Sequence, residues 1–453
     1  MPQQQQSLAL SEDQLEALNK TLNYGMPEHT RQMLNSLSAA DIAHLLESSP
    51  PRQRSILWKL IPVEDEGDVL NEMGEEVRQF FIDQMNIQEL ISIFEDQDVD
   101  DIADILQQLP KQITYRVLDS MDYQNRQRVE EVLAYPENTA GGLMNTDTVT
   151  VRKDITVEVA LRYLRQHNSL PQPLDQLLVV DRFDQFQGAV PISDLLTADP
   201  STLLADLIDH AIQPVPVSME DTHVAQLFER EDLVSAPVVD ESCHLLGRIT
   251  VDDVVDVIRD EAEHSIMSMA GLDEDEDTFA PVLRTTRRRA VWLGINLITA
   301  FIASGVIGLF QETIDQVVAL AVLMPIVASM GGIAGSQTLT LIIRAMALGQ
   351  IGKSNTTWLL TREGLVGLLN GLFWAIVVSA AAMVWFDDQT ITLVIGLSMV
   401  INLVVAVLSG AMLPLVLKSL DIDPALAGSV ILTTITDVVG FLSFLGLATL
   451  FYT

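Results

Sequence analysis

Five long apolar runs fill the C-terminal part of the chain, at 291–310, 316–347, 358–386, 391–417 and 425–452. Each is long enough for an α-helix to cross the hydrocarbon core of a bilayer, which takes roughly 20 residues. Charged positions are nearly confined to the short stretches between the runs. The pattern predicts an all-α transmembrane domain of five helices over 284–453, surrounded by membrane lipid.

The first 135 residues show the spacing of short amphipathic helices and contain an internal repeat. Residues 41–50, Asp-Ile-Ala-His-Leu-Leu-Glu-Ser-Ser-Pro, match residues 101–110, Asp-Ile-Ala-Asp-Ile-Leu-Gln-Gln-Leu-Pro, at an offset of 60. Each copy is predicted to be a helix that ends near proline and is followed by another helix. Paired helices of this kind stack on their neighbours. An α-helical, solenoid-like N-domain is therefore predicted over 1–135.

Between 136 and 264, β-branched runs alternate with helical stretches, and a second duplication is present. Residues 178–194 align with residues 237–253 at an offset of 59, and each copy gives a strand, a turn, a glycine, a strand and a helix opened by aspartate. This order resembles a tandem of cystathionine-β-synthase-type (CBS) domains, an α/β module that often binds adenine nucleotides. We place the two domains at 136–200 and 201–258.

In CBS domains a Ser/Thr-x-x-Asp motif at the last strand–helix junction holds a ribose, and only the second copy has it. Thr250 and Asp253 form the motif there, whereas Pro191 stands at the hydroxyl position of the first copy. The resemblance implies at most one good ribose site, with ATP as the candidate ligand. A helix N-cap by Asp253 explains the same residues without a ligand.

Acidic residues crowd the next segment, which we expect to form a connecting helix over 259–283. A helix this acidic repels itself unless cations lie against it, and carboxylate oxygens are the ligands that Mg²⁺ and Ca²⁺ prefer. A solvated acidic linker is the alternative. The acids are Asp252, Asp253, Asp256, Asp260, Glu261, Glu263 and Asp273–Asp277, and Arg259 is the one lysine or arginine among them.

The net charge of −36, from 26 Lys+Arg and 62 Asp+Glu, belongs wholly to the region before Pro281. From Pro281 onward there are eight basic and eight acidic residues, which leaves 18 basic and 54 acidic residues before it. Such a surplus repels nucleic acid and anionic lipid surfaces and attracts divalent cations. The single cysteine, Cys243, excludes an intramolecular disulfide and fits a reducing compartment. The first residues lack the basic and apolar regions of a signal peptide, so internal segments are expected to direct membrane insertion.

Basic residues sort to one side of the apolar runs, which predicts the orientation of the chain. The loops at 312–315 and 387–388, after the first and third runs, carry no basic residue. The positive-inside rule therefore predicts cytoplasmic N-terminal domains and a C-terminus on the periplasmic or extracellular side. The sorted residues are Arg284 and Arg287–Arg289 before the first run, Arg344, Lys353 and Arg362 between the second and third, and Lys418 between the fourth and fifth.

Asp437 lies about midway along the last run, where an ionisable side chain is costly unless it meets water, a partner or an ion. Thr433, Thr434 and Thr436 add hydroxyls just before it. One interpretation is an aspartate that is hydrogen-bonded between packed helices. We favour the other interpretation, in which Asp437 faces a water-filled path for a cation.

The second run would measure about 48 Å if it were fully helical, and it contains Pro325 and then Gly-Gly-Ile-Ala-Gly-Ser-Gln at 331–337. Proline removes a helical hydrogen bond, and glycine tolerates unwound backbone. Freed carbonyls near Asp437, with Gly331 and Gly332 as their backbone, would form a constriction for a cation. Close helix packing through small residues is the alternative.

These features together resemble the MgtE family of magnesium channels over nearly the whole chain. They include a helical N-domain that ends in Tyr-Pro-Glu-Asn-Thr-Ala-Gly-Gly-Leu-Met at 135–144, paired CBS domains, an acidic connecting helix and five spans. The most specific pieces are residues 423–440 and the Gly-Gly-x-x-Gly-x-Gln of the second run. The resemblance implies a homodimer in a bacterial inner membrane, with Asp437 of each subunit holding hydrated Mg²⁺ in a pore on the two-fold axis.

The resemblance also implies that cytosolic Mg²⁺ closes the pore by bridging acidic side chains of the soluble part. One position departs from the family: its asparagine after the glycine pair is Ile333 here, which leaves the selectivity among Mg²⁺, Co²⁺ and Mn²⁺ open. Ser336 and Gln337 are the residues that could compensate. The matching regulatory positions are Asp100, Asp104, Glu220, Asp232, Asp253, Asp256 and Glu261, with Asp423 at the membrane.

A Mg²⁺-permeable channel gated by cytosolic Mg²⁺ is the leading hypothesis. The alternative is a secondary transporter that exchanges Mg²⁺ or Co²⁺ for H⁺ or Na⁺, with Asp437 as the coupling carboxylate. A CBS-regulated anion channel is disfavoured by that carboxylate and by the lack of basic groups within the spans. An enzyme is not predicted, because no nucleophile–base pair or phosphate-binding glycine loop is evident.

Overall fold

A computed structural model describes residues 27–453 except 95, 96, 98, 108, 168, 169, 172, 273–275, 353, 421 and 453, and leaves out the side chains of 27–29 and 100. Two compact units make up the chain: Met1–Ala262 with Asp275–Pro281, and Glu263–Glu274 with Val282–Thr453. The first 26 residues of the predicted N-domain lie outside the described residues, as do Lys353 and three of the predicted acids, Asp273, Glu274 and Asp275.

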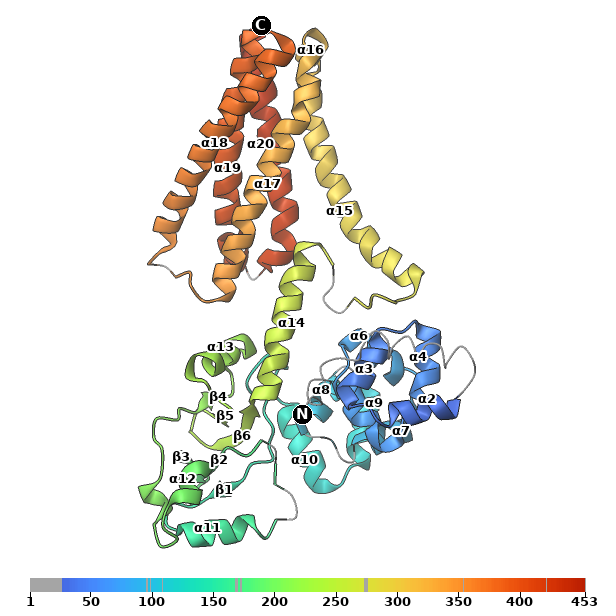
Figure 1. Ribbon diagram of the computed structural model, residues 1–453, viewed down its shortest axis with the longest axis vertical. Helices are drawn as coiled ribbons and strands as arrows, with labels where there is room; N and C mark the ends of the chain where they lie inside the picture. Colours follow the sequence, from blue (N-terminus) through green and yellow to red (C-terminus); the bar gives the residue numbers. More distant parts are fainter. Residues whose placement is uncertain are drawn as a thin grey trace, which may run out of the picture. The chain divides into compact units, whose positions relative to one another are not determined.

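Short helices form the N-terminal part of the first unit (Figure 1). The predicted repeat is confirmed, because α3 and α4 are separated by Pro50 in the way that α8 and α9 are separated by Pro110. Ser38 begins α3 with a reciprocal cap to Asp41, which fixes where the first copy starts. The helices are α2 (Pro27–Leu34), α3 (Ala39–Glu47), α4 (Pro51–Trp58), η1 (Val63–Asp65), α5 (Glu66–Asn71), α6 (Glu75–Ile82), α7 (Ile87–Ile93), α8 (Val99–Gln107), α9 (Lys111–Ser120) and α10 (Tyr123–Val132).

A buried ion pair holds a distant segment on these helices. Arg54 of α4 is 1% exposed, and its Nη2 donates to Oδ1 of Asp277 at 2.8 Å. The backbone N–H of Asp277 donates to the Glu76 carboxylate at 2.8 Å. Two-pronged arginine–carboxylate pairs are geometrically specific. The segment that leads into the first apolar helix is therefore part of the first unit.

The CBS copies fold as predicted, each into a three-stranded sheet. In the first, β1 (Thr150–Val151) is parallel to β2 (Gln176–Val180), which is antiparallel to β3 (Phe186–Pro191). The second repeats this with β4 (Val215–Pro216), β5 (Ser235–Val239) and β6 (Leu245–Thr250). Gln176 Nε2 donates to Ser235 Oγ at 3.0 Å and joins the two copies. The accompanying helices are α11 (Val157–Leu164), α12 (Ile192–Thr197), η3 (Leu204–Asp206) and α13 (Asp221–Glu231).

The connecting helix has other bounds than the sequence indicated. Helix α14 runs from Val251 to Met269, whereas 259–283 was predicted. Its start is fixed at the end of β6, and its end is a Schellman motif. Leu272 N–H donates to Met267 O and Gly271 N–H to Ser268 O, with Gly271 at φ 69°. The predicted continuation of the helix to 283 is wrong, because the chain turns at Gly271. The prediction rested on the acidic pattern, which continues past this residue.

Five helices of the second unit are long and apolar enough to cross a membrane. The predicted spans are confirmed within a few residues except the first. Helix α15 begins at Val282, nine residues before the predicted start at 291, because the arginines that precede the apolar run are part of the helix. Helices α17 to α20 run side by side, and α15 diverges from α20 toward its N-terminal end (Figure 1). The bounds are α15 (Val282–Gly308), the short α16 (Gln311–Gln316), α17 (Ala319–Ala347), α18 (Thr356–Phe386), α19 (Gln389–Ser419) and α20 (Pro424–Tyr452).

Candidate functional site

Asp437 lies near the middle of α20, and its side chain is half-buried. The residues that pack into the bundle around it are Leu432, Thr436 and Gly440. Among the described residues, none donates a hydrogen bond to the Asp437 carboxylate or pairs with its charge. The alternative interpretation was an aspartate that is hydrogen-bonded between packed helices. The described part of the chain contains no such hydrogen bond to Asp437.

The threonines before Asp437 use their hydroxyl hydrogens within α20. Thr433 Oγ1 donates to Ser429 O and Thr434 Oγ1 to Val430 O, each at 2.8 Å, and Thr436 Oγ1 donates to Thr433 O at 3.0 Å. Bonds of this kind satisfy the hydroxyl donor inside the helix. What remains for a ligand is the lone pairs of the oxygens, which suit a cation or the hydrogens of its water shell.

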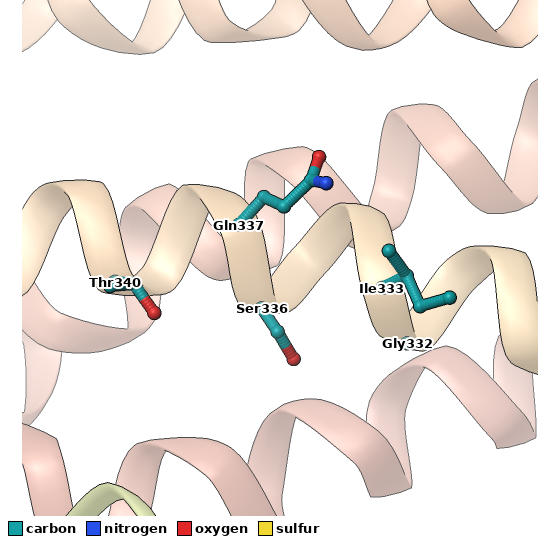
Figure 2. A pocket seen from close by; sticks show the side chains of 5 residues that line it. All are labelled: Gly332, Ile333, Ser336, Gln337 and Thr340. Carbon is teal, nitrogen blue, oxygen red and sulfur yellow. The ribbon is translucent and has the colours of Figure 1, made fainter. Parts of the chain in front are cut away.

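One face of α17 is open and lined by polar groups (Figure 2). The side chains of Ile333, Ser336, Gln337 and Thr340 project from this face, and a Cβ at Gly332 would meet no atom within 4 Å. Polar side chains at membrane depth face a protein partner or water rather than lipid. This open face therefore fits a water-filled path or an interface.

The opposite face of α17 is packed, and here the structure corrects the sequence analysis. Helix α17 continues without a break through Pro325 and the glycines, so the predicted unwound backbone is wrong. A Cβ at Gly335 would lie 3.0 Å from Leu432 Cδ1, and one at Gly410 would lie 2.4 Å from the carbonyl oxygen of Gly335. The glycines let backbones approach while helical hydrogen bonds stay intact, as the apolar interior demands. Gly331 belongs to this packed face and Gly332 to the open one.

Asp104 of α8 lies within the electrostatic field of Asp253 of α14 in the first unit. Burial raises the pKa of Asp104 to about 7, and the charges of Glu137 and Asp253 add to this, against Arg78. Burial and the charge of Asp252 raise the pKa of Asp253 to about 6. Asp104 and Asp253, which are 149 positions apart in the sequence, thus repel each other in the fold.

Asp253 also has a local structural role. Its Oδ2 accepts from Thr250 Oγ1 at 2.9 Å and from Thr250 N–H at 3.3 Å, at the start of α14. The two residues of the ribose motif are therefore bonded to each other, in the manner of a helix cap. One turn later, Asp256 pairs with Arg259 at 3.1 Å. Burial raises the pKa of Asp256, against the charge of Arg259.

The other predicted regulatory acids are more dispersed. Glu220 pairs with His223 at 3.4 Å before α13, and Asp232 ends α13 at φ 52°. Glu261 is exposed on α14, and the side chain of Asp100 lies outside the described residues. Within the described residues, no group of three or more His, Cys, Asp or Glu side chains lies close enough to hold a metal ion. The acids share electrostatic fields without forming a chelating group.

Asp423 is engaged on both oxygens. Oδ1 accepts from Ala425 N–H at 2.8 Å and Oδ2 from Leu426 N–H at 3.0 Å, which caps α20. Oδ2 also lies 3.2 Å from His264 Nε2, on the last turns of α14. Sequence reasoning did not single out His264, because a lone histidine in an acidic helix carries no spacing signal.

Two acids and one amide of the sites were also missed. Glu137 lies near Asp104 and raises its pKa, and the pKa of Glu72, next to α5, is raised by burial and by the charge of Asp256. Their positions carried no visible signal, since acids are abundant in this region. Asn402 could have been noticed in the sequence, because it is a polar residue inside an apolar run. Its amide lies between α17 and α20.

Comparison with known proteins identifies the class of protein. The model of a family described as divalent cation transporter matches residues 324–447, that of an MgtE intracellular N domain matches 37–138, and that of a CBS domain matches 140–201. The magnesium transporter MgtE of Thermus thermophilus is 31% identical over 440 residues, which cover 96% of this chain and 97% of that protein. The MgtE of Bacillus subtilis is 27% identical over 423 residues, or 93% of each chain.

A solved structure resembles the soluble part. It is the crystal structure of the cytosolic domain of the Mg²⁺ channel MgtE in complex with ATP, with 30% identity and a TM-score of 0.50, and the match covers 54% of this chain and 99% of that one. The fold and these likenesses define a membrane transporter with a regulatory-type CBS pair. The chain belongs to the MgtE family of magnesium transporters.

The raised pKa of Asp104 makes the first unit sensitive to pH when no divalent cation is bound. Between its ordinary pKa of 3.8 and about 7, the folded state holds a proton that the unfolded state releases. Stability from this group is therefore present at low pH and lost as the pH rises through about 7. We expect Asp104→Asn to slow hydrogen exchange of α8 at pH 8 without Mg²⁺ by about 10- to 100-fold, or roughly 1.5–3 kcal/mol. The gain should vanish near pH 4.

The measurement is hydrogen exchange of the full-length protein, corrected for the intrinsic pH dependence of amide exchange. Glu75→Gln, at an exposed acid of α6, is the matched control and should leave α8 unchanged. Equal exchange rates at pH 8 for parent and Asp104→Asn would show that the Asp104 carboxylate is well solvated.

Proposed function

We propose that this protein is a homodimeric, Mg²⁺-permeable channel of a bacterial inner membrane, closed from the cytosol by Mg²⁺ at its acidic residues. The observation that carries the proposal is the half-buried Asp437, which has no partner among the described residues of a membrane-spanning helix. A carboxylate without a partner at that depth is costly unless it meets water or a cation. Mg²⁺ sheds its water reluctantly, so Asp437 is proposed to hold the ion through its hydration shell.

The open face of α17 supports the proposal of a path or an interface. Ser336, Gln337 and Thr340 offer oxygen atoms on a face that the single chain leaves open. A second copy across a two-fold axis would enclose such a face and bring in a second Asp437. The proposed orientation puts the soluble domains in the cytosol, because the basic residues sort to that side.

Regulation is proposed to act on the acids that the fold crowds together. The raised pKa values of Asp104, Asp253 and Asp256 mean that the charged form of each carboxylate is destabilised in the fold. Bound Mg²⁺ would relieve the repulsion and select a compact, closed state. Moving a population from mostly open to mostly closed takes roughly 5 kcal/mol of differential binding, which several weak sites can supply jointly. Glu220, Asp232, Glu261 and Asp423 are the further proposed regulatory residues.

ATP is proposed as a second ligand, on the strength of the related cytosolic domain. A ribose bound at the Thr250–Asp253 motif would have to replace the hydrogen bond that these side chains now share. Nucleotide binding would thus weaken the cap of α14. Because Asp253 belongs both to this cap and to the proposed regulatory acids, nucleotide binding would also affect those acids.

The pore assignment is tested by replacing Asp437 in protein reconstituted into liposomes. Asp437→Ala should lower Mg²⁺ uptake by about 100-fold or more, because the attraction for the ion is lost. Asp437→Asn should be severely impaired but retain some hydrogen bonding to ion-bound waters. Asp315→Asn, at an exposed acid of α16, is the control and should transport normally. Full uptake by the alanine variant would exclude Asp437 from the path. If uptake depended on an H⁺ or Na⁺ gradient, the channel hypothesis would be rejected in favour of the secondary transporter.

Ile333 tests whether the open face of α17 meets the ion. Ile333→Asn places an amide beside Gly332 and should change the ratio of Mg²⁺ to Co²⁺ uptake, because amide oxygens rank these cations differently from an apolar side chain. Leu341→Asn, at another exposed position of α17, is the control and should keep the parental ratio. An unchanged ratio in both variants would place position 333 away from the permeating ion.

The proposed sensor is tested by removing three charges from α14. The combined variant Asp253→Asn, Asp256→Asn and Glu261→Gln should stay open at Mg²⁺ concentrations that close the parent, since the cations lose their ligands. Protection of the soluble part from protease by Mg²⁺ should weaken in parallel. The control removes three exposed acids elsewhere in the unit, at Glu64, Glu75 and Asp199. Closure of the α14 variant at the parental concentration would show that these acids form a solvated face.

A further inference from the structure

Asn402 is a fully buried amide in the interior of the membrane-spanning bundle. It lies in α19, and its side chain is 0% exposed. Nδ2 donates to the carbonyl oxygen of Val327 in α17 at 2.8 Å. Oδ1 has no hydrogen-bond partner among the described residues. A buried acceptor left without a donor is uncommon in native proteins and calls for an explanation.

Two glycines make room for this amide on neighbouring helices. A Cβ at Gly331 of α17 would lie 2.4 Å from Asn402 Nδ2, and one at Gly440 of α20 would lie 3.0 Å from the same atom. Real Cβ atoms do not approach so closely as 2.4 Å, so any side chain at 331 would displace the amide. The amide is thus fitted between α17 and α20, and its hydrogen bond to another helix reaches Val327 of α17.

Packing alone does not account for an asparagine at this place. An apolar side chain with as many heavy atoms would remove the unpaired Oδ1, and the Val327 carbonyl would keep its place in the backbone hydrogen bonds of the continuous helix α17. What the amide adds is a directional bond, which fixes how α19 and α17 are aligned along their axes. Buried polar groups can fix such an alignment at a cost in stability.

Both helices that Asn402 contacts carry the candidate ion path. Gly440 follows Asp437 by three residues, which is about one turn of α20. Gly331 immediately precedes Gly332 and Ile333 of the open face of α17. Displacement of the amide would therefore shift both surfaces.

We propose that Asn402 is a positioning residue for cation transport: its hydrogen bond aligns α19 with α17, and its amide, fitted between Gly331 and Gly440, sets the spacing of α17 and α20. It does not contact the ion. The consequence is that removing the amide impairs transport and discrimination between cations more than it impairs folding.

The test compares substitutions in the full-length protein in liposomes. Asn402→Leu keeps the number of side-chain heavy atoms and the branch at Cγ but not the hydrogen bond, and it should fold with a melting temperature close to that of the parent. Mg²⁺ uptake per folded molecule should fall about tenfold or more, since small misplacements at a site are costly. The concentration of Co²⁺ that halves Mg²⁺ uptake should also shift. Ser398→Ala is the matched control, because Ser398 is also 0% exposed on α19 but donates its hydrogen bond within its own helix, to Ile395 O.

A second pair of variants decides the matter even if leucine is not tolerated at position 402. Gly331→Ala should impair uptake in the parent, where its methyl group meets the amide. It should cost little more in an Asn402→Ala background, where the amide is gone. An equal loss in both backgrounds would overturn the proposal, as would parental uptake and Co²⁺ inhibition in Asn402→Leu. A loss confined to the yield of folded protein would mark Asn402 as a packing residue only. These readouts need magnesium transport alone and do not depend on Asp437 or on gating.

Discussion

Repulsion among buried and half-buried carboxylates is the interaction on which the soluble part depends. The region before Pro281 carries the whole net charge of −36, and the fold nevertheless brings Asp104, Glu137 and Asp253 within each other's field. Few bases oppose them: Arg78 lowers the pKa of Asp104, and Arg259 lowers that of Asp256. A fold that confines anions in this way gains stability whenever protons or divalent cations arrive. The charge distribution is therefore the physical reason for the proposal that bound Mg²⁺ makes this part more compact.

The membrane part meets the opposite constraint, because its eight acidic and eight basic residues balance and its interior must leave no backbone group unpaired. Its helices therefore stay continuous, even through Pro325, and approach one another through glycines. Polar side chains of these helices lie both in the interior of the bundle and on its surface. Asn402 lies inside the bundle, while Ser336, Gln337 and Thr340 lie on the open face of α17.

Features that repeat or persist along the sequence could be predicted from it. The five apolar runs became five helices, and the duplications at offsets of 60 and 59 became helix pairs and sheets of the same order, because periodicity and burial are local properties. Helix ends were harder, since α14 stops through a backbone motif at Gly271 and α15 starts at arginines that the hydropathy pattern excluded. The orientation of Gly331 could not be predicted at all. One residue of shift turns a helical position by about 100°, so only the contact with Asn402 distinguishes it from Gly332.

Contacts between distant residues are the part of the site that sequence patterns conceal. Arg54 and Asp277 are 223 positions apart, and neither stands out in a chain with 26 basic and 62 acidic residues. Their pairing nevertheless decides where the segment before α15 belongs. Only four residues separate Asp277 from Val282, so a displacement of the N-terminal helices that carries Asp277 with it reaches the start of α15 through a very short tether. Breaking a buried ion pair of this kind costs about 3–5 kcal/mol, because one charge is left unpaired. The N-terminal helices are therefore linked to the start of α15 by this ion pair and the four residues that follow Asp277, in addition to the link through α14. The proposed gating has to account for both links.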